Sequence, residues 1–137
     1  MIKGLAHVCI AARDLAATEE FYCSTLGFMK LFDFIRKGEK IGFYLTVSEN
    51  TYIEVFRQDV VDAHAKSPIT HICFEVSDID EVIRRIRSCG RDVTDKQLGA
   101  DNSWQSWTAD PSGVKIEFHQ YTSESSQLTG RNCEVDW

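Results

Sequence analysis

Two histidines and two glutamates recur at nearly the same spacing in the two halves of the chain. Glu54 follows His7 by 47 residues, and Glu117 follows His71 by 46 residues. Two imidazoles and two carboxylates suit a divalent cation such as nickel, zinc, cobalt, iron or manganese, because the two negative charges balance the ion. Such a set leaves positions open for water or substrate, which is typical of catalytic sites. We therefore predict that His7, Glu54, His71 and Glu117 bind one divalent metal ion.

The sequence around these residues repeats with them. The segment HVCI at residues 7–10 corresponds to HICF at residues 71–74, a shift of 64 residues. The glutamates lie in similar segments, IEVF at residues 53–56 and IEFH at residues 116–119. Four polar positions that repeat together favour two similar modules over a chance spacing.

A helix is predicted in each module. An Asp lies seven residues after each His and a Gly lies 20 or 19 residues after it, and these are common N-cap and C-cap residues. The first helix is expected from Leu15 to Leu26. The second follows Asp78, which forms a capping box with Glu81, and has apolar residues at i, i+3, i+4 and i+7. These apolar residues are Ile79, Val82, Ile83 and Ile86.

Three short strands are expected after each helix. They span 28–36, 41–47 and 51–57 in the first half, and 92–98, 104–109 and 114–121 in the second. The last two are joined by residues 110–113 (DPSG), which have the sequence of a type I turn. Runs of strands joined by short turns imply antiparallel neighbours and exclude a doubly wound parallel sheet. We therefore predict an α+β protein made of two βαβββ modules.

Strand alternation places the four predicted ligands on one face and the apolar residues of the repeated segments on the other. The apolar face is expected to pack on the helices, which leaves the ligands to line a cleft. The competing interpretation makes the histidines core or interface residues held by hydrogen bonds, and the glutamates exposed strand residues.

Further side chains share the face of the predicted ligands. Cys9 and Cys73 lie two residues beyond the histidines, where a thiolate suits a softer metal. A strand Cys is more often a small buried hydrophobe. Trp107, His119 and Phe56 are expected either to line an apolar substrate pocket or to belong to the core.

Composition excludes several classes of partner. The formal net charge of -6, from 15 basic and 21 acidic residues, argues against binding to nucleic acid or to an anionic membrane. The apolar run from Leu5 to Ala12 is far shorter than a membrane span. Five cysteines without a CxxC pair indicate neither a disulfide framework nor structural zinc. We expect a cytoplasmic protein that acts on a small molecule.

Nearly the whole sequence resembles the vicinal oxygen chelate superfamily, which includes glyoxalase I, bleomycin-resistance proteins and extradiol dioxygenases. The segments that carry the resemblance are HVCIAARDLAATEEFYCSTLGF, TYIEVF, THICFEVSDIDEVIRRIRSCG and WTADPSGVKIEF. The resemblance implies one domain over residues 1–121, built from repeats 1–58 and 68–121. It further implies a curved mixed sheet around a metal cleft and a homodimer. Residues 122–137 are expected to form a polar C-terminal tail.

The ligand order His, Glu, His, Glu matches bacterial glyoxalase I, whereas methylmalonyl-CoA epimerases usually carry Gln at the second place. The resemblance implies a metal-dependent lyase or isomerase that moves a proton on a hemithioacetal or a related α-hydroxycarbonyl compound. Glu117 would be the primary base, and Glu54 would return the proton from the opposite side. Glutathione-using members carry Arg and Asn where this chain has Ala11 and Gln58. Glutathione itself is therefore not predicted as the thiol.

Three other functions stay open from the sequence. One is an Fe(II) extradiol-type dioxygenase, although those enzymes resemble this chain only in part and typically have three ligands. Another is a non-catalytic protein that binds a drug or metabolite, as bleomycin-resistance proteins do. The third is an epimerase or a thiol transferase with the same ligand set, which only Glu54 separates from a glyoxalase. The four complete ligands favour a lyase over a binding protein.

Overall fold

The structure is a computed structural model that describes residues 1, 3–60, 68–133 and 135 of the chain. These residues form two compact units. Unit 1 comprises Met1–Pro68 together with Asp110–Gly113, and unit 2 comprises Ile69–Ala109 together with Val114–Trp137. None of the helices in the described ranges is long and apolar enough to span a membrane.

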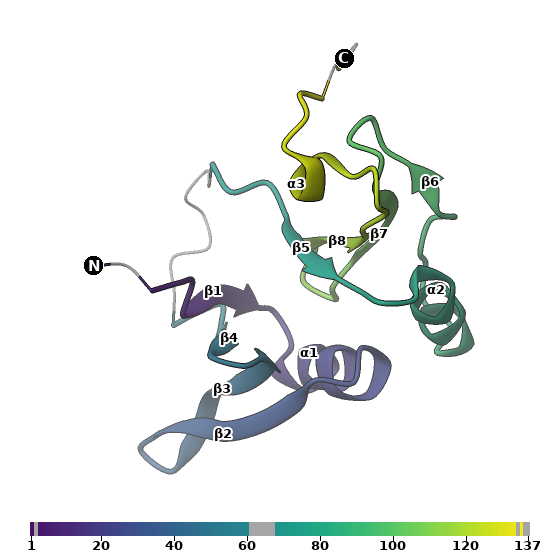
Figure 1. Cartoon of the computed structure of the whole chain (residues 1–137). Helices are drawn as coiled ribbons and strands as arrows, with labels where there is room; N and C mark the ends of the chain where they lie inside the picture. Colours follow the sequence, from purple (N-terminus) through teal and green to yellow (C-terminus); the bar gives the residue numbers. More distant parts are fainter. Residues whose placement is uncertain (2, 61–67, 134, 136–137) are drawn as a thin grey trace. The chain divides into compact units, whose positions relative to one another are not determined.

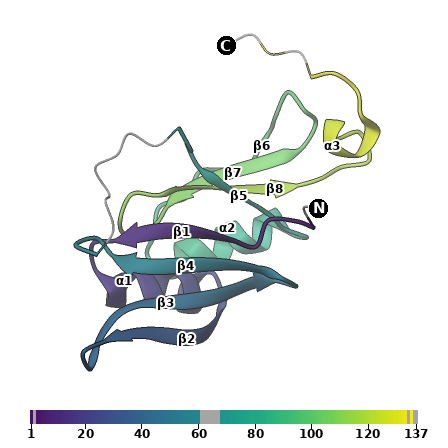
Figure 2. The same cartoon turned by 90° about the vertical axis from the view of Figure 1, so that its left-hand side faces the viewer.

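Unit 1 contains a mixed four-stranded sheet with the order β1-β4-β3-β2 (Figure 1). β1 (His7–Ala12) runs parallel to β4 (Thr51–Arg57). β3 (Glu39–Ser48) is antiparallel to both β4 and β2 (Met29–Arg36). Figure 2 shows these four strands side by side in this order. The first and last strands of the unit are therefore neighbours.

Unit 2 repeats this topology with the order β5-β8-β7-β6. β5 (Ile72–Glu75) is parallel to β8 (Lys115–Gln120), and β8 is antiparallel to β7 (Trp104–Ala109). β7 also pairs with β6 (Gln97–Leu98), which completes the sheet. The predicted α+β fold with two βαβββ modules is confirmed, and each module has its own mixed sheet.

The strand predicted over residues 92–98 is mostly wrong, because only its last two residues belong to β6. Residues 92–96 do lie along β7, but side-chain hydroxyls make some of the hydrogen bonds that backbone groups would make in a regular strand pair. Thr94 uses its backbone N–H to bind the carbonyl of Trp107 at 2.9 Å and its hydroxyl to accept from the Trp107 N–H at 2.9 Å. The Thr108 hydroxyl donates to the Asp92 carbonyl at 2.7 Å. Hydroxyl groups thus hold this segment without regular strand pairing.

The two predicted helices begin and end where the sequence predicts. Asp14 accepts a hydrogen bond from Ala17 N–H before α1 (Leu15–Glu19), and Asp78 accepts from Glu81 N–H before α2 (Ile79–Ser88). Beyond the helix ends, Gly27 and Gly90 have φ of 83° and 70°, a conformation that favours glycine. The first helix is not α-helical throughout, since α1 continues directly as the π-helix η1 (Glu20–Thr25).

Each sheet buries one face against the helix of its own unit. In unit 1, Ile53 and Val55 of β4 are buried, as are Phe21 and Tyr22 of η1. In unit 2 the corresponding core comes from β8 and from one stripe of α2. Its buried members are Ile79, Ile83, Ile86, Ile116 and Phe118. Because strand side chains alternate, the residues between the buried ones lie on the opposite face.

Two segments of the second half make contacts that the predicted strands do not account for. The turn Asp110–Gly113 belongs to unit 1, because Tyr22 donates its hydroxyl to Asp110 at 3.2 Å and Arg13 N–H donates to the Ser112 hydroxyl at 3.0 Å. After β8 the chain forms the short helix α3 (Ser126–Thr129), preceded by the fully buried Ser125.

Candidate metal centre

In unit 1, the first predicted ligand pair comes from the two parallel strands. His7 is the first residue of β1 and Glu54 lies in the middle of β4, with His7 Nε2 at 3.8 Å from Glu54 Oε2. Cys9, Glu54 and Tyr44 lie opposite one another across β1, β4 and β3. The His7 ring meets the Tyr44 ring edge-on, at 5.9 Å between centroids. The sequence-predicted pair is therefore brought together on the sheet face away from the helix.

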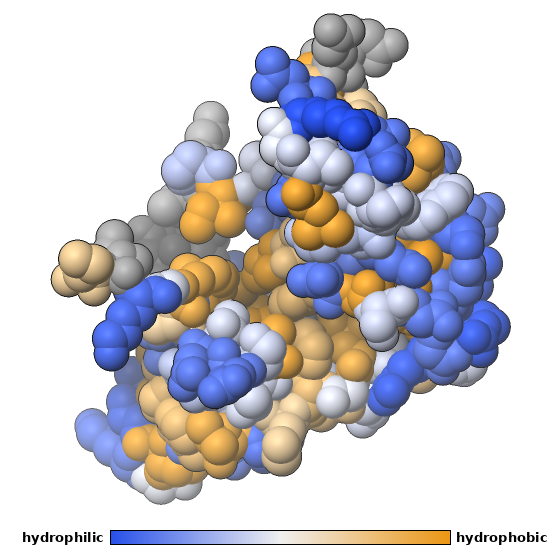
Figure 3. Space-filling model, in the orientation of Figure 1, coloured by the Kyte–Doolittle hydropathy of each residue, from blue (hydrophilic) through white to orange (hydrophobic). Residues whose placement is uncertain are grey.

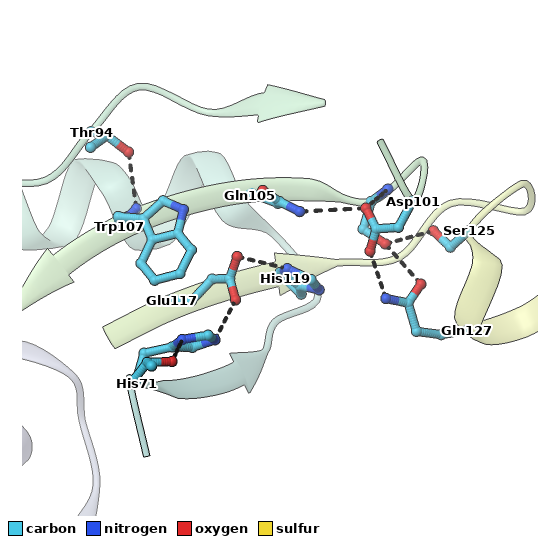
Figure 4. Close-up of polar contacts among 11 residues, drawn as sticks. His71, Thr94, Asp101, Gln105, Trp107, Glu117, His119, Ser125 and Gln127 are labelled. Carbon is cyan, nitrogen blue, oxygen red and sulfur yellow. Dashed lines mark hydrogen bonds and ion pairs between the residues drawn. The ribbon is translucent and has the colours of Figure 1, made fainter. Parts of the chain in front are cut away.

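In unit 2, the second pair has the same arrangement (Figure 4). His71 immediately precedes β5, and its Nε2 lies 3.2 Å from Glu117 Oε2. Cys73, Glu117 and Trp107 lie opposite one another across β5, β8 and β7. The His71 ring meets Trp107 at 4.9 Å between centroids, and its Nδ1 lies 2.9 Å from the Thr70 hydroxyl. Contacts on both sides of the ring orient Nε2 towards the carboxylate.

The two carboxylates differ in their surroundings. The side chain of Glu117 is 8% exposed, whereas that of Glu54 is 21% exposed. Glu117 also has a second histidine beside it, because Nε2 of His119 lies 3.0 Å from Oε1 (Figure 4). This contact lacks hydrogen-bond geometry, and the buried His119 Nε2 has no hydrogen-bond partner among the described residues. The position equivalent to His119 in unit 1 is occupied by Phe56.

Each carboxylate also has a thiol beside it. Burial and the neighbouring Glu54 carboxylate raise the pKa of Cys9 to about 11. Burial and the Glu117 carboxylate raise the pKa of Cys73 to about 12. Both thiols are therefore protonated at neutral pH in the metal-free protein. In unit 2, one ligand atom each from Cys73, Glu117 and His119 lie within 4.8 Å of one another.

The donor distances fit a bound cation. Two donors that bind one metal at about 2.0–2.2 Å, with angles near those of a tetrahedron or octahedron, are about 3.0–3.5 Å apart. The His71–Glu117 distance of 3.2 Å lies in this range, and the His7–Glu54 distance of 3.8 Å lies just above it. Each pair therefore needs little or no rearrangement to act as two ligands of one ion.

Aromatic side chains surround the ligand pair of unit 1. The Tyr44 ring stacks on Phe32 at 4.9 Å and on Tyr52 at 5.2 Å, while Phe56 contacts Phe34 at 4.6 Å. Of the predicted pocket residues, Phe56 therefore belongs to this cluster, whereas Trp107 and His119 flank Glu117 in unit 2. Phe32 and Tyr44 were not predicted as site residues, although alternation with the apolar Phe43 and Leu45 would have placed Tyr44 on the face away from the core.

The edge of the unit 1 sheet is hydrophobic as well. Met29, Leu31, Phe32 and Ile35 of β2 are all exposed. Figure 3 shows hydrophobic side chains gathered over the region where β2 and β3 lie. The ligand pair of unit 1 therefore shares its sheet with a broad apolar surface.

Comparison with known proteins identifies the family. Residues 4–118 match the family described as the Glyoxalase/Bleomycin resistance protein/Dioxygenase superfamily. The chain belongs to this superfamily. A relative of this chain, the uncharacterized protein YaeR of Escherichia coli K12, is 26% identical over 132 residues, which cover 87% of this chain and 97% of YaeR.

Solved structures with the same fold have different described functions. A lactoylglutathione lyase from Agrobacterium tumefaciens has a TM-score of 0.67 at 21% identity, covering 87% of this chain and 94% of that one. The antibiotic-binding protein TnmS3 from Streptomyces sp. CB03234 has a TM-score of 0.71 at 19% identity, covering 88% and 98%. At these identities the likeness shows the fold alone.

Proposed function

We propose that this protein is a metal-dependent lyase or isomerase of the glyoxalase type, acting on a hemithioacetal or a related α-hydroxycarbonyl compound. The observation that carries the proposal is the repeated His–Glu pair, with donor atoms 3.8 Å apart in unit 1 and 3.2 Å apart in unit 2. Both pairs together, His7, Glu54, His71 and Glu117, would bind one divalent cation, with nickel, zinc or cobalt as the first choices and iron or manganese after them.

The chemistry divides between the metal and the two carboxylates. When bound, the metal would act as a Lewis acid towards two adjacent oxygens of the substrate. A proton on the carbon beside a hydroxyl is a poor acid, so a base must come within hydrogen-bond reach of it. We assign this role to Glu117, and the return of the proton to Glu54. The low exposure of Glu117 supports the assignment, because it limits proton exchange with bulk water.

The first test is metal analysis of protein purified without chelator. We expect about one equivalent of divalent metal per chain in the wild type and its loss in Glu54→Ala and His71→Ala. Glu49→Gln is a matched control, because Glu49 is an exposed turn residue and should leave the metal content unchanged. Wild-type protein that neither carries nor takes up metal would overturn the proposal.

The second test is turnover. Metal-loaded protein should isomerise the hemithioacetal of methylglyoxal with at least one thiol. A panel of low-molecular-weight thiols is needed, because Ala11 and Gln58 stand where glutathione-using members carry Arg and Asn. Oxygen uptake with catechols in the iron-loaded protein would instead assign the dioxygenase chemistry of other members.

A second candidate function is the binding of an aromatic metabolite or drug without catalysis. The aromatic cluster around Tyr44 favours it, and the antibiotic-binding neighbour has the same fold. This candidate predicts that planar aromatic compounds bind the metal-free protein, and that His71→Ala binds them equally well. Binding that requires the metal would favour the enzyme.

The quaternary state and cellular location remain predictions. We expect a homodimer in the cytoplasm, as the family resemblance and the cysteine usage suggest. Sedimentation equilibrium of the full chain tests the dimer directly, and a monomeric mass at micromolar concentration would contradict it.

A further inference from the structure

Three ligand types meet on one sheet face of unit 2. Cys73 of β5 lies opposite Glu117 of β8, and His119 follows two residues later on the same strand and face. One ligand atom each from Cys73, Glu117 and His119 lie within 4.8 Å of one another. Sulfur, oxygen and nitrogen donors are thus gathered by two adjacent strands of a single unit.

His119 supplies an independent indication of a ligand. It is 9% exposed, and its Nε2 has no hydrogen-bond partner among the described residues. The same nitrogen lies 3.0 Å from Glu117 Oε1. A buried imidazole nitrogen without a hydrogen bond is unfavourable, whereas a cation beside Glu117 would satisfy both the nitrogen and the carboxylate.

The donor set favours a thiophilic cation. Thiolate sulfur selects ions such as Zn²⁺ and Cd²⁺ over Mg²⁺ or Ca²⁺, and Zn–S and Zn–N bonds are about 2.3 and 2.0 Å long. Sulfur and nitrogen bound to one tetrahedral ion are then about 3.5 Å apart, whereas the present donors lie within 4.8 Å of one another, so binding requires the donors to move closer together. The Cys73 side chain is exposed to incoming ions.

Unit 1 provides the matched comparison. Cys9 and Glu54 occupy the same register as Cys73 and Glu117. The third position is Phe56 instead of His119, so unit 1 has a thiol and a carboxylate but lacks the imidazole at that place. A thiolate site that needs all three donors is therefore expected in unit 2 alone.

We propose that unit 2 contains a binding site of its own for a thiophilic divalent cation, formed by Cys73, Glu117 and His119. The site needs no ligand from unit 1, and it therefore goes beyond the His–Glu–His–Glu site proposed above. On binding, the cation replaces the Cys73 thiol proton, which is released to solvent. Glu117 is common to both ligand sets, so a cation held by Cys73 competes with catalytic metal for this carboxylate.

The test is Cd²⁺ titration of the full-length protein, followed by the ultraviolet absorption of the cadmium–thiolate bond. We expect saturation at one equivalent per chain in the wild type and in the control Cys9→Ser. The signal should be lost in Cys73→Ser, and the affinity should fall about tenfold or more in His119→Phe, which gives unit 2 the residue of unit 1. Absence of the wild-type signal, or its loss in Cys9→Ser, overturns the proposal.

A double variant separates this site from the proposed enzyme. His7→Ala with Glu54→Gln removes two ligands of the four-ligand site and should abolish isomerisation while leaving the cadmium–thiolate signal intact. Loss of the signal in this variant would show that the thiolate site depends on unit 1. If Cys73→Ser does not fold, alkylation of wild-type protein decides, because Cd²⁺ should protect Cys73 and leave Cys9 reactive.

Discussion

The two units use one strand register to surround their carboxylates with different side chains. Across the central row, Cys9, Glu54 and Tyr44 in unit 1 correspond to Cys73, Glu117 and Trp107 in unit 2. The next row reads Ala11, Phe56 and Gly42 in unit 1, and Glu75, His119 and Gln105 in unit 2. The repeat thus preserves the ligand positions, while the neighbouring row sets how polar and how enclosed each carboxylate is.

This difference suggests separate tasks for the two carboxylates. Glu117 is enclosed and contacts His71 through Oε2 and His119 through Oε1. Glu54 is more exposed and has aromatic neighbours in place of a second histidine. An enclosed carboxylate suits the first proton transfer, whereas a more exposed one suits return of the proton and exchange with solvent.

The largest expected effect comes from Glu117→Gln, which keeps the shape of the side chain but removes the base. Loss of general-base catalysis should lower kcat for hemithioacetal isomerisation by about 100-fold or more. Metal content is measured alongside, so that a lost ion is distinguished from a lost base. Retained activity in metal-loaded Glu117→Gln would refute the assignment, and Glu49→Gln serves again as the unaffected control.

The second-largest effect is a loss of stability when a side chain is added at Gly42, which lies beside Phe56 in unit 1. A Cβ added to Gly42 would lie 2.2 Å from the Val55 carbonyl oxygen and 2.8 Å from the Phe56 ring. Gly42→Ala should therefore reduce the free energy of unfolding by about 1–3 kcal/mol. Gly4→Ala is the control, because a Cβ there meets nothing within 4 Å. Chemical denaturation of both variants measures the difference, and equal stabilities would contradict the predicted clash.

A third experiment converts one unit towards the other. Phe56→His places an imidazole two residues after Glu54, as His119 follows Glu117. If the composition of this row decides thiolate binding, the variant should bind a second Cd²⁺ through Cys9, with affinity about tenfold or more above that of unmodified unit 1. A cadmium–thiolate signal that stays at one equivalent would show that this register and an imidazole at position 56 are not sufficient to create the site.

The smallest effect is the slow reaction of both ligand-face thiols in the metal-free protein. Because the pKa of Cys9 is raised to about 11 and that of Cys73 to about 12, the thiolate fraction of each should increase about tenfold per pH unit between pH 8 and 10. At pH 8, iodoacetamide should therefore alkylate both thiols more slowly than it alkylates an unperturbed cysteine. Peptide mass spectrometry across this pH range follows both, and pH-independent rates would contradict the raised pKa values.

Much of the fold follows from local sequence signals. Asp14 and Asp78 cap their helices as predicted, because a short carboxylate before an apolar stripe satisfies free backbone N–H groups. The nearly equal spacing from His to Glu, 47 and 46 residues, predicted that each pair would meet on one sheet face. Whether both pairs bind a single ion stays a prediction, because it depends on the relation between the units and not on the pattern within either.

The features that the sequence did not predict depend on tertiary contacts. Residues 92–96 lie along β7 through the hydroxyls of Thr94 and Thr108, which mimic strand hydrogen bonds without strand geometry. Helix α3 has only four residues and no apolar stripe, and a buried hydrogen bond from Ser103 to Ser125 fixes the chain before it. Strand alternation could have predicted that His119 lies beside Glu117, because the two residues share a face of β8. It could not have predicted that the His119 side chain is buried.

Pairing of the first strand with the last has a consequence for folding kinetics. Cys9 and Glu54 are 45 residues apart in sequence, and Cys73 and Glu117 are 44 apart, yet each pair lies side by side on parallel strands. Closing such a long loop is entropically costly and typically slow, whereas the β2–β3 and β3–β4 hairpins form from local contacts. During synthesis, each histidine therefore emerges from the ribosome long before its glutamate, and neither pair is assembled until the last strand of its sheet, β4 or β8, has been made.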